Sequence, residues 1–252
     1  PMDEILHALA AQHAELADRL SGLDEAGWQR ASRCDGWTVT DVVLHLAQTD
    51  EMALASLQGR FGELLDSWAR GFETADDVDD GADMLVASQR GGAPADVFER
   101  WSAGTAALRA AFAATDPHLR VEWVAGTLSA HTLTATRLAE CWIHTGDVGA
   151  ATGGVPAPTD RLEHVARLAW RTLPYAFDRA GRTLAGPVTF DLVAPSGARW
   201  LFEPEGEAAT VIEGDGAELC EVAGQRRDAG TTGLQAEGPD AAAVLELVRT
   251  FA

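Results

Sequence analysis

Glu140 and His144 lie four residues apart in the segment AECWIHTGDV (139–148), which has the composition of a helix. Residues at this spacing share one face of a helix, with their Cβ atoms about 5–6 Å apart. A carboxylate oxygen and an imidazole nitrogen can therefore approach a common point. The pair fits a surface ion pair, a buried hydrogen-bonded pair, or two ligands of a metal site. The spacing alone does not distinguish these three interpretations.

A third candidate ligand, His45, comes from the earlier segment CDGWTVTDVVLHLA (34–47). If the helix that carries His45 faces the helix that carries Glu140, two imidazoles and one carboxylate converge. Such a set suits zinc or a related divalent ion and leaves one coordination position open, as in catalytic sites. Two alternatives stay open at this point. His45 has apolar neighbours and fits a core histidine, and Arg137 offers Glu140 an ordinary ion pair.

The elements that would position these residues follow from hydrophobic periodicity. The spacing predicts helices over 3–23, 39–57, 94–115, 129–152 and 159–181. Thr38 followed by Asp41 is a capping-box signature at the start of the second helix. Pro174 is expected to kink or break the last one, with Asp160 as its cap. The acidic stretch 71–83 is predicted to be a solvated loop, and so is the region around Trp123 and Gly126.

The hydrophobicity pattern changes after about residue 182, where apolar and polar residues begin to alternate. The pattern predicts a β-hairpin over 187–204, strands at 208–214 and 231–238, and short helices at 214–227 and 239–252. We therefore expect a mainly α protein, with a helical bundle over 2–182 and a small α+β domain over 183–252.

Composition narrows the class of protein. The formal net charge is −20, which disfavours nucleic acid and anionic membranes as partners. The three cysteines are odd in number and widely spaced, so we expect no disulfide framework and a reducing, cytoplasmic location. We expect neither a membrane span nor an N-terminal secretion signal. The sequence is compatible with a monomer or a small homo-oligomer.

The two segments resemble the signature segments of the mycothiol-dependent maleylpyruvate isomerase family, within the DinB-like superfamily. The matching residues are Cys34, Gly36, Trp37, Thr38, Asp41, His45, Leu46 and Ala47 in the first segment, and Glu140, His144 and Asp147 in the second. The resemblance implies a DinB-like four-helix bundle followed by a small sterol-carrier-like α+β domain. It also assigns the metal ligands to His45, Glu140 and His144, with zinc as the first ion to test.

The family's second domain carries a W-G-R segment whose arginine faces the active site. AGQRR (223–227) is similar to it, so the resemblance implies a catalytic role for Arg226. The tryptophan is absent here, and Arg227 competes for the role. A guanidinium at this position would suit a carboxylate of an anionic substrate or cofactor, and a surface arginine pair is the alternative interpretation.

The resemblance further implies a low-molecular-weight thiol, such as mycothiol, as cosubstrate. Coordination to a divalent cation deprotonates a thiol whose pKa is otherwise about 8.5–9. In the family's isomerase the thiolate adds to a conjugated double bond, the bond rotates, and elimination returns the thiol. The chain is therefore expected to act on a small molecule as an isomerase or S-transferase. A metal-dependent hydrolase or lyase and a non-catalytic binding protein remain alternatives, and Cys34, Cys141 and Cys220 are not expected to be nucleophiles.

Overall fold

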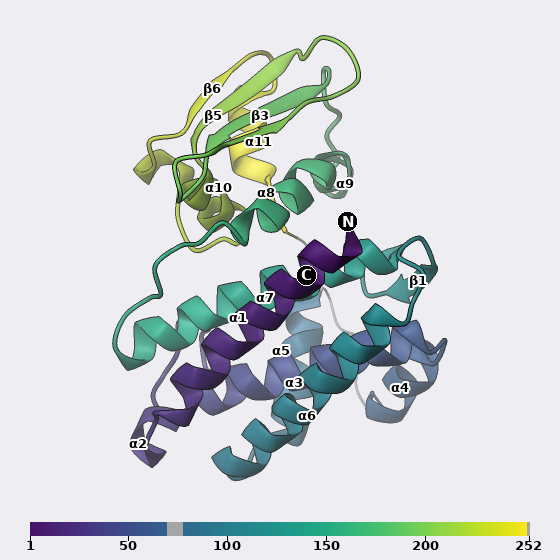
Figure 1. Cartoon of the computed structure of the whole chain (residues 1–252), viewed down its shortest axis with the longest axis vertical. Coiled ribbons are helices and arrows are strands. Elements are labelled where there is room, and N and C mark those ends of the chain that lie inside the picture. Colours follow the sequence, from purple (N-terminus) through teal and green to yellow (C-terminus); the bar gives the residue numbers. More distant parts are fainter. Residues whose placement is uncertain (70–77, 251–252) are drawn as a thin grey trace. The chain divides into compact units, whose positions relative to one another are not determined.

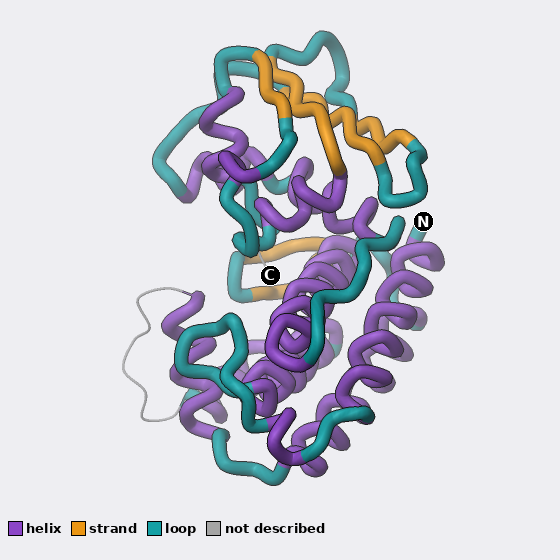
Figure 2. Tube along the Cα trace, turned by 90° about the vertical axis from the view of Figure 1, so that its left-hand side faces the viewer, coloured by secondary structure: helices purple, strands orange, loops and turns teal. Residues whose placement is uncertain are grey.

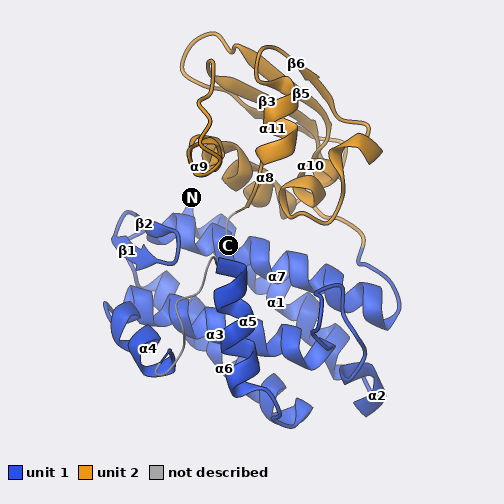
Figure 3. Cartoon of the chain, turned by 180° about the vertical axis from the view of Figure 1, so that it is seen from behind, with its two compact units in different colours: residues 1–156 blue, residues 157–252 orange. Residues whose placement is uncertain are grey.

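The computed structural model describes residues 1–69 and 78–250 and divides into two compact units, Pro1–Pro156 and Ala157–Ala252 (Figure 3). The sequence placed the change of domain between residues 182 and 183. The helix at 162–171, however, packs against the helix at 216–223 and against the strand at 199–202, both in the second unit. The division into compact units does not test where each domain folds on its own. The domain boundary at 182/183 therefore stays a prediction.

Four long helices form a bundle in the first unit (Figure 1). They are α1 (Met2–Ser21), α3 (Val39–Leu57), α6 (Pro94–Ala113) and α7 (Ala130–Thr152). Helix α3 contacts α6 and α7, and α1 contacts the same two helices, so each helix has two neighbours. The apolar positions of the predicted helices fill the interior, and Leu9, Leu16 and Leu46 are all fully buried.

Shorter elements connect the long helices. They are α2 (Glu25–Trp28), α4 (Phe61–Trp68), α5 (Val78–Gln89) and an antiparallel hairpin of β1 (Arg120–Trp123) and β2 (Gly126–Ser129). In residues 1–69 and 78–250, no helix is long and apolar enough to span a membrane.

The second unit combines helices with a four-stranded sheet (Figure 2). Its elements are α8 (Leu162–Arg171), α9 (Leu173–Arg179), β3 (Val188–Val193), β4 (Arg199–Phe202), β5 (Thr210–Asp215), α10 (Gly216–Ala223), the 3-10 turn η1 (Ala229–Thr231), β6 (Gln235–Glu237) and α11 (Ala241–Leu247). The strand order is β4-β3-β5-β6. Strand β3 pairs antiparallel with β4 and parallel with β5, and β6 pairs antiparallel with β5.

The predicted fold class is confirmed, and three local predictions are wrong. Residues 78–83 of the expected acidic loop form the first turns of α5, while 71–77 lie outside the described residues. Asp79 and Asp80 stand in the first turn, where carboxylates favour a helix through its dipole. The region around Trp123 forms the β1–β2 hairpin rather than a loop.

The third wrong prediction concerns the start of the helix expected over 159–181. Its chain breaks near Pro174, as predicted, into α8 and α9. Asp160, however, does not cap it, because α8 begins after Arg161 without a side-chain cap. The Asp160 carboxylate instead accepts a hydrogen bond from the Ser196 backbone N–H at 3.0 Å, so it ties the hairpin to the helix start.

Candidate metal centre

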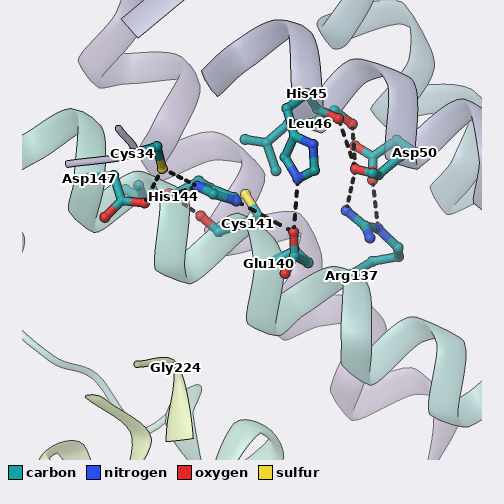
Figure 4. A network of polar contacts seen from close by, with 12 residues as sticks. Cys34, His45, Leu46, Asp50, Arg137, Glu140, Cys141, His144, Asp147 and Gly224 are labelled. Atoms are coloured by element: carbon teal, nitrogen blue, oxygen red, sulfur yellow. Dashed lines mark hydrogen bonds and ion pairs between the residues drawn. The ribbon is translucent and has the colours of Figure 1, made fainter. Parts of the chain in front are cut away.

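His45 of α3 meets Glu140 and His144 of α7 inside the bundle (Figure 4). Glu140 Oε2 lies 3.3 Å from His45 Nε2 and 3.5 Å from His144 Nε2. One ligand atom from each of the three residues lies within 4.8 Å of the other two. The three side chains expected from the sequence to converge are therefore brought together.

The starts of both helices fix where these side chains fall. Helix α3 begins at a capping box, in which the Thr38 side chain accepts from the Asp41 N–H and the Asp41 carboxylate accepts from the Thr38 N–H. Arg90 adds an ion pair to Asp41 at 2.9 Å. Helix α7 is capped by Ser129, whose side chain accepts a hydrogen bond from the Thr132 backbone N–H. The caps fix where each helix starts, which places His45 about two turns into α3, and Glu140 and His144 about three and four turns into α7.

The three donors are largely withdrawn from water. His45 is 9% exposed and His144 is 6% exposed, while the Glu140 side chain is 14% exposed. The Trp37 ring packs against the His45 ring, with centroids 5.0 Å apart. The three side chains are therefore largely shielded from water, in part by the Trp37 ring.

The protonation of the centre follows from burial and from its hydrogen bonds. Burial lowers the pKa of His45, and the hydrogen bond to Glu140 only partly opposes this, so His45 is neutral. Burial opposes ionisation of Glu140, but hydrogen bonds to His144 and His45 hold its pKa well below the usual value. Burial also disfavours a charged His144, yet hydrogen bonds to Asp147, Cys34 and Glu140 raise its pKa well above the usual value. The surroundings therefore stabilise a positive charge on His144, which contacts the carboxylates of Glu140 and Asp147.

These donors fit a divalent cation on three grounds. Two imidazoles and a carboxylate are ligands of catalytic zinc sites. An ion bound tetrahedrally at about 2.0–2.1 Å places its donor atoms about 3.3–3.4 Å apart, close to the 3.3 and 3.5 Å observed. With both imidazoles neutral, as metal binding requires, the ionised Glu140 carboxylate leaves a buried negative charge that a cation would neutralise.

Arg137, the alternative partner for Glu140, is engaged elsewhere among the described residues. Its Nε donates to Asp50 Oδ1 at 3.0 Å, and its Nη2 donates to Thr49 Oγ1 at 2.8 Å. Both partners lie on α3, so the pair links α3 to α7 next to the metal donors (Figure 4). The Glu140 carboxylate is left to the two imidazoles.

Comparison with known proteins identifies the family. The family model described as "Mycothiol maleylpyruvate isomerase N-terminal domain" matches residues 9–149, more than half of the chain. The chain belongs to this family. Two proteins of Mycobacterium tuberculosis, both described as uncharacterized and from strains CDC 1551 / Oshkosh and ATCC 25618 / H37Rv, are each 31% identical over 247 residues. The match covers 97% of this chain and 93% of each relative.

Two solved structures share the fold of the whole chain. They are crystal structures of the mycothiol-dependent maleylpyruvate isomerase and of a mutant of that enzyme, with TM-scores of 0.59 and 0.61. Each is 23% identical in sequence, and the match covers 96% of both chains. The predicted arrangement of a helical bundle followed by an α+β domain is therefore the fold of this family.

Two further residues of the family segments lie next to His144. His144 Nδ1 donates to Asp147 Oδ2 at 2.9 Å, and the Asp147 side chain is fully buried. Cys34 places its Sγ 3.5 Å from the same Asp147 oxygen and 3.9 Å from His144 Nδ1. The nearness of Cys34 to His144 was not predicted, although its place in the first family segment gave a signal.

The other two cysteines lie in apolar surroundings. Cys141 and Cys220 are fully buried, and burial raises the pKa of both thiols far above neutrality. They therefore stay protonated and behave as small apolar residues.

Arg226 and Arg227 lie in the second unit, directly after α10. Arg227 pairs with Glu218 at 3.1 Å and with Glu221 at 3.2 Å, which engages it on its own unit. Arg226 is partly buried and donates to the Gly224 carbonyl at 3.1 Å. Gln225, which directly precedes Arg226, has a φ of 57°, a backbone conformation that favours glycine. This is the position at which the family's W-G-R segment has its glycine, so the backbone agrees with aligning the arginine of that segment on Arg226. The catalytic role of Arg226 stays a prediction.

Proposed function

We propose that the chain is a metal-dependent enzyme that activates a low-molecular-weight thiol of the mycothiol class. The thiol would add to a small electrophilic substrate, and the enzyme would act as an isomerase or an S-transferase. Membership of the family supports the thiol and the enzyme class. The observation that carries the proposal is the convergence of His45, Glu140 and His144 from two helices of the bundle.

The chain's own residues prepare this chemistry in three ways. His45 is neutral, which is the form of imidazole that binds a metal. Glu140 contributes the negative charge, held ionised by its two imidazole neighbours. Burial around all three limits access of water, which strengthens the electrostatic interactions at the centre. When bound, a divalent cation supplies a Lewis acid that lowers the pKa of an incoming thiol.

Metal-dependent thiol binding tests the proposal directly. We expect mycothiol, titrated into the zinc-loaded protein in a calorimeter, to bind in a one-to-one complex. The metal-free protein and the His45→Ala variant should show no such binding, because the sulfur has lost its cation. An S-methylated mycothiol is the matched control and should bind weakly, since its sulfur has no proton to lose.

Failure of this titration has a clear meaning. If neither mycothiol nor smaller thiols bind the zinc-loaded protein, the thiol proposal is wrong. Turnover of electrophiles by the loaded protein without any thiol would then favour the hydrolase or lyase alternative.

We also propose that Arg226 binds a carboxylate of the substrate, for which a chain of net charge −20 needs local positive charge. With maleylpyruvate as the probe electrophile, Arg226→Ala is expected to raise KM by about 10–100-fold, the effect of losing one charged hydrogen bond. Arg227→Ala is the matched control and should leave KM unchanged, because Arg227 is paired with Glu218 and Glu221. Equal KM values for Arg226→Ala and the unmodified protein would remove Arg226 from the site.

A further inference from the structure

The two ring nitrogens of His144 face different groups (Figure 4). Nε2 faces Glu140 Oε2 at 3.5 Å, on the side of the metal donors. Nδ1 faces Asp147 Oδ2 at 2.9 Å, on the opposite side of the ring. The Cys34 thiol donates to the same Asp147 oxygen at 3.5 Å, so one carboxylate oxygen accepts from a ring N–H and a thiol.

We propose that Asp147 and Cys34 are positioning residues that hold His144 ready to bind the metal. This inference rests on the proposed function, because it assigns a role toward the ion that function requires. Asp147 sets the orientation of the ring, and Cys34 holds the Asp147 carboxylate in place.

The role of Asp147 follows from what a carboxylate can do. An ionised carboxylate only accepts hydrogen bonds, so the proton between the two groups belongs to His144 Nδ1. With Nδ1–H committed to Asp147, Nε2, which faces Glu140, is the nitrogen that would give up its proton and bind the metal. Asp147 is fully buried and lies three residues beyond His144 on α7, so the contact between the two side chains is shielded from water. Carboxylates placed behind a ligating histidine commonly act in this way.

The role of Cys34 follows from the turn that carries it. The turn over Cys34–Trp37 is closed by a hydrogen bond from the Trp37 N–H to the Cys34 carbonyl at 3.0 Å, with Gly36 at a φ of 75°. The Ser32 hydroxyl accepts from the Cys34 N–H at 3.1 Å and donates to the Trp37 carbonyl at 2.9 Å. These bonds hold the thiol against α7, where it covers the Asp147 carboxylate. The turn thereby connects the segment before α3 to a ligand on α7.

The experiment compares zinc affinity by competition with a chromophoric chelator. Asp147→Asn keeps the shape of the side chain and removes its charge, and we expect zinc to bind about 10–100-fold more weakly. Cys34→Ala should weaken binding less, because a thiol is a weak donor. Cys34→Ser restores a donor at the same place and should return the affinity close to that of the unmodified chain.

Two readouts separate positioning from general destabilisation. The visible spectrum of the cobalt-loaded protein reports ligand geometry, and we expect it to change in Asp147→Asn. The matched control is Thr136→Val, which removes a buried hydroxyl on α7 that donates to the Leu133 carbonyl at 2.8 Å. It should reduce thermal stability without changing the zinc affinity or the cobalt spectrum.

Unchanged zinc affinity and cobalt spectrum in Asp147→Asn would overturn the inference. Weaker binding in Asp147→Asn with full affinity in Cys34→Ala would overturn the part given to Cys34. His45→Ala tells these failures apart from failure of the proposed function. If His45→Ala loses zinc while Asp147→Asn keeps it, only the positioning role is wrong, and if His45→Ala also keeps zinc, the metal centre itself is wrong.

Discussion

Replacing Arg137 by methionine is expected to lower the free energy of unfolding by about 3–5 kcal/mol, because the Asp50 carboxylate is left buried without its cation. The two side chains are 1% and 3% exposed and are joined at 3.0 Å. Arg137 also donates to Thr49 and lies over the Trp123 ring, 5.7 Å from its centroid. Urea unfolding monitored by tryptophan fluorescence measures the loss.

The control removes both charges at once. Arg137→Met combined with Asp50→Leu leaves no unpaired charge in the interior, so most of the lost stability should return. A loss of less than about 1 kcal/mol in Arg137→Met alone, the size found for an exposed pair, would show that the Arg137–Asp50 pair does not behave as a buried one.

The cost of Arg137→Met should also depend on pH. Burial raises the pKa of Asp50 to about 6 even though Arg137 lowers it, and removing Arg137 raises it further. The folded state then binds a proton that the unfolded state releases near pH 4, so stability falls as pH rises toward the folded pKa. The deficit of the variant is therefore expected to be larger at pH 8 than at pH 5.

Removing either histidine of the metal centre is expected to abolish metal binding. The unmodified protein should carry about one divalent ion per chain, because three protein ligands hold a catalytic ion. His45→Ala and His144→Ala each leave two ligands and should purify without it. At a free zinc concentration 100 times Kd, zinc should stabilise the unmodified protein by about 2.7 kcal/mol and leave both variants unchanged.

His118→Ala is the matched control for these two variants. His118 is an exposed histidine of the same unit whose backbone N–H bonds to Asp116. It should keep both the metal content and the stabilisation by zinc. Full occupancy in His144→Ala would show that the ligand set is wrong.

The long helices and the convergence at the centre could be predicted because they rest on local rules. The capping box of Thr38 and Asp41 set the start of α3, and it begins at the predicted residue. The spacing of Glu140 and His144 put both on one helix face, and His45 met them because α3 and α7 are neighbours in the bundle.

Other features could not be predicted, because they depend on contacts between distant parts of the chain. Arg137 and Asp50 are 87 positions apart, and nothing local to Arg137 distinguishes Asp50 from Glu140 as its partner. The alternation of apolar and polar side chains identifies a strand but does not indicate which neighbour it pairs with. The parallel pairing of β3 with β5 could therefore not be predicted. The strands β1 and β2 have four residues each, too few for their alternation to stand out from a loop.

The central claim is that His45, Glu140 and His144 share one divalent ion. Diffraction data collected on both sides of the zinc absorption edge, from crystals of the zinc-loaded protein, locate that ion directly. We predict one strong anomalous peak within about 2.0–2.2 Å of the two imidazole nitrogens and the Glu140 carboxylate. Zinc found elsewhere in the molecule, with no anomalous peak among these three side chains, would contradict the claim.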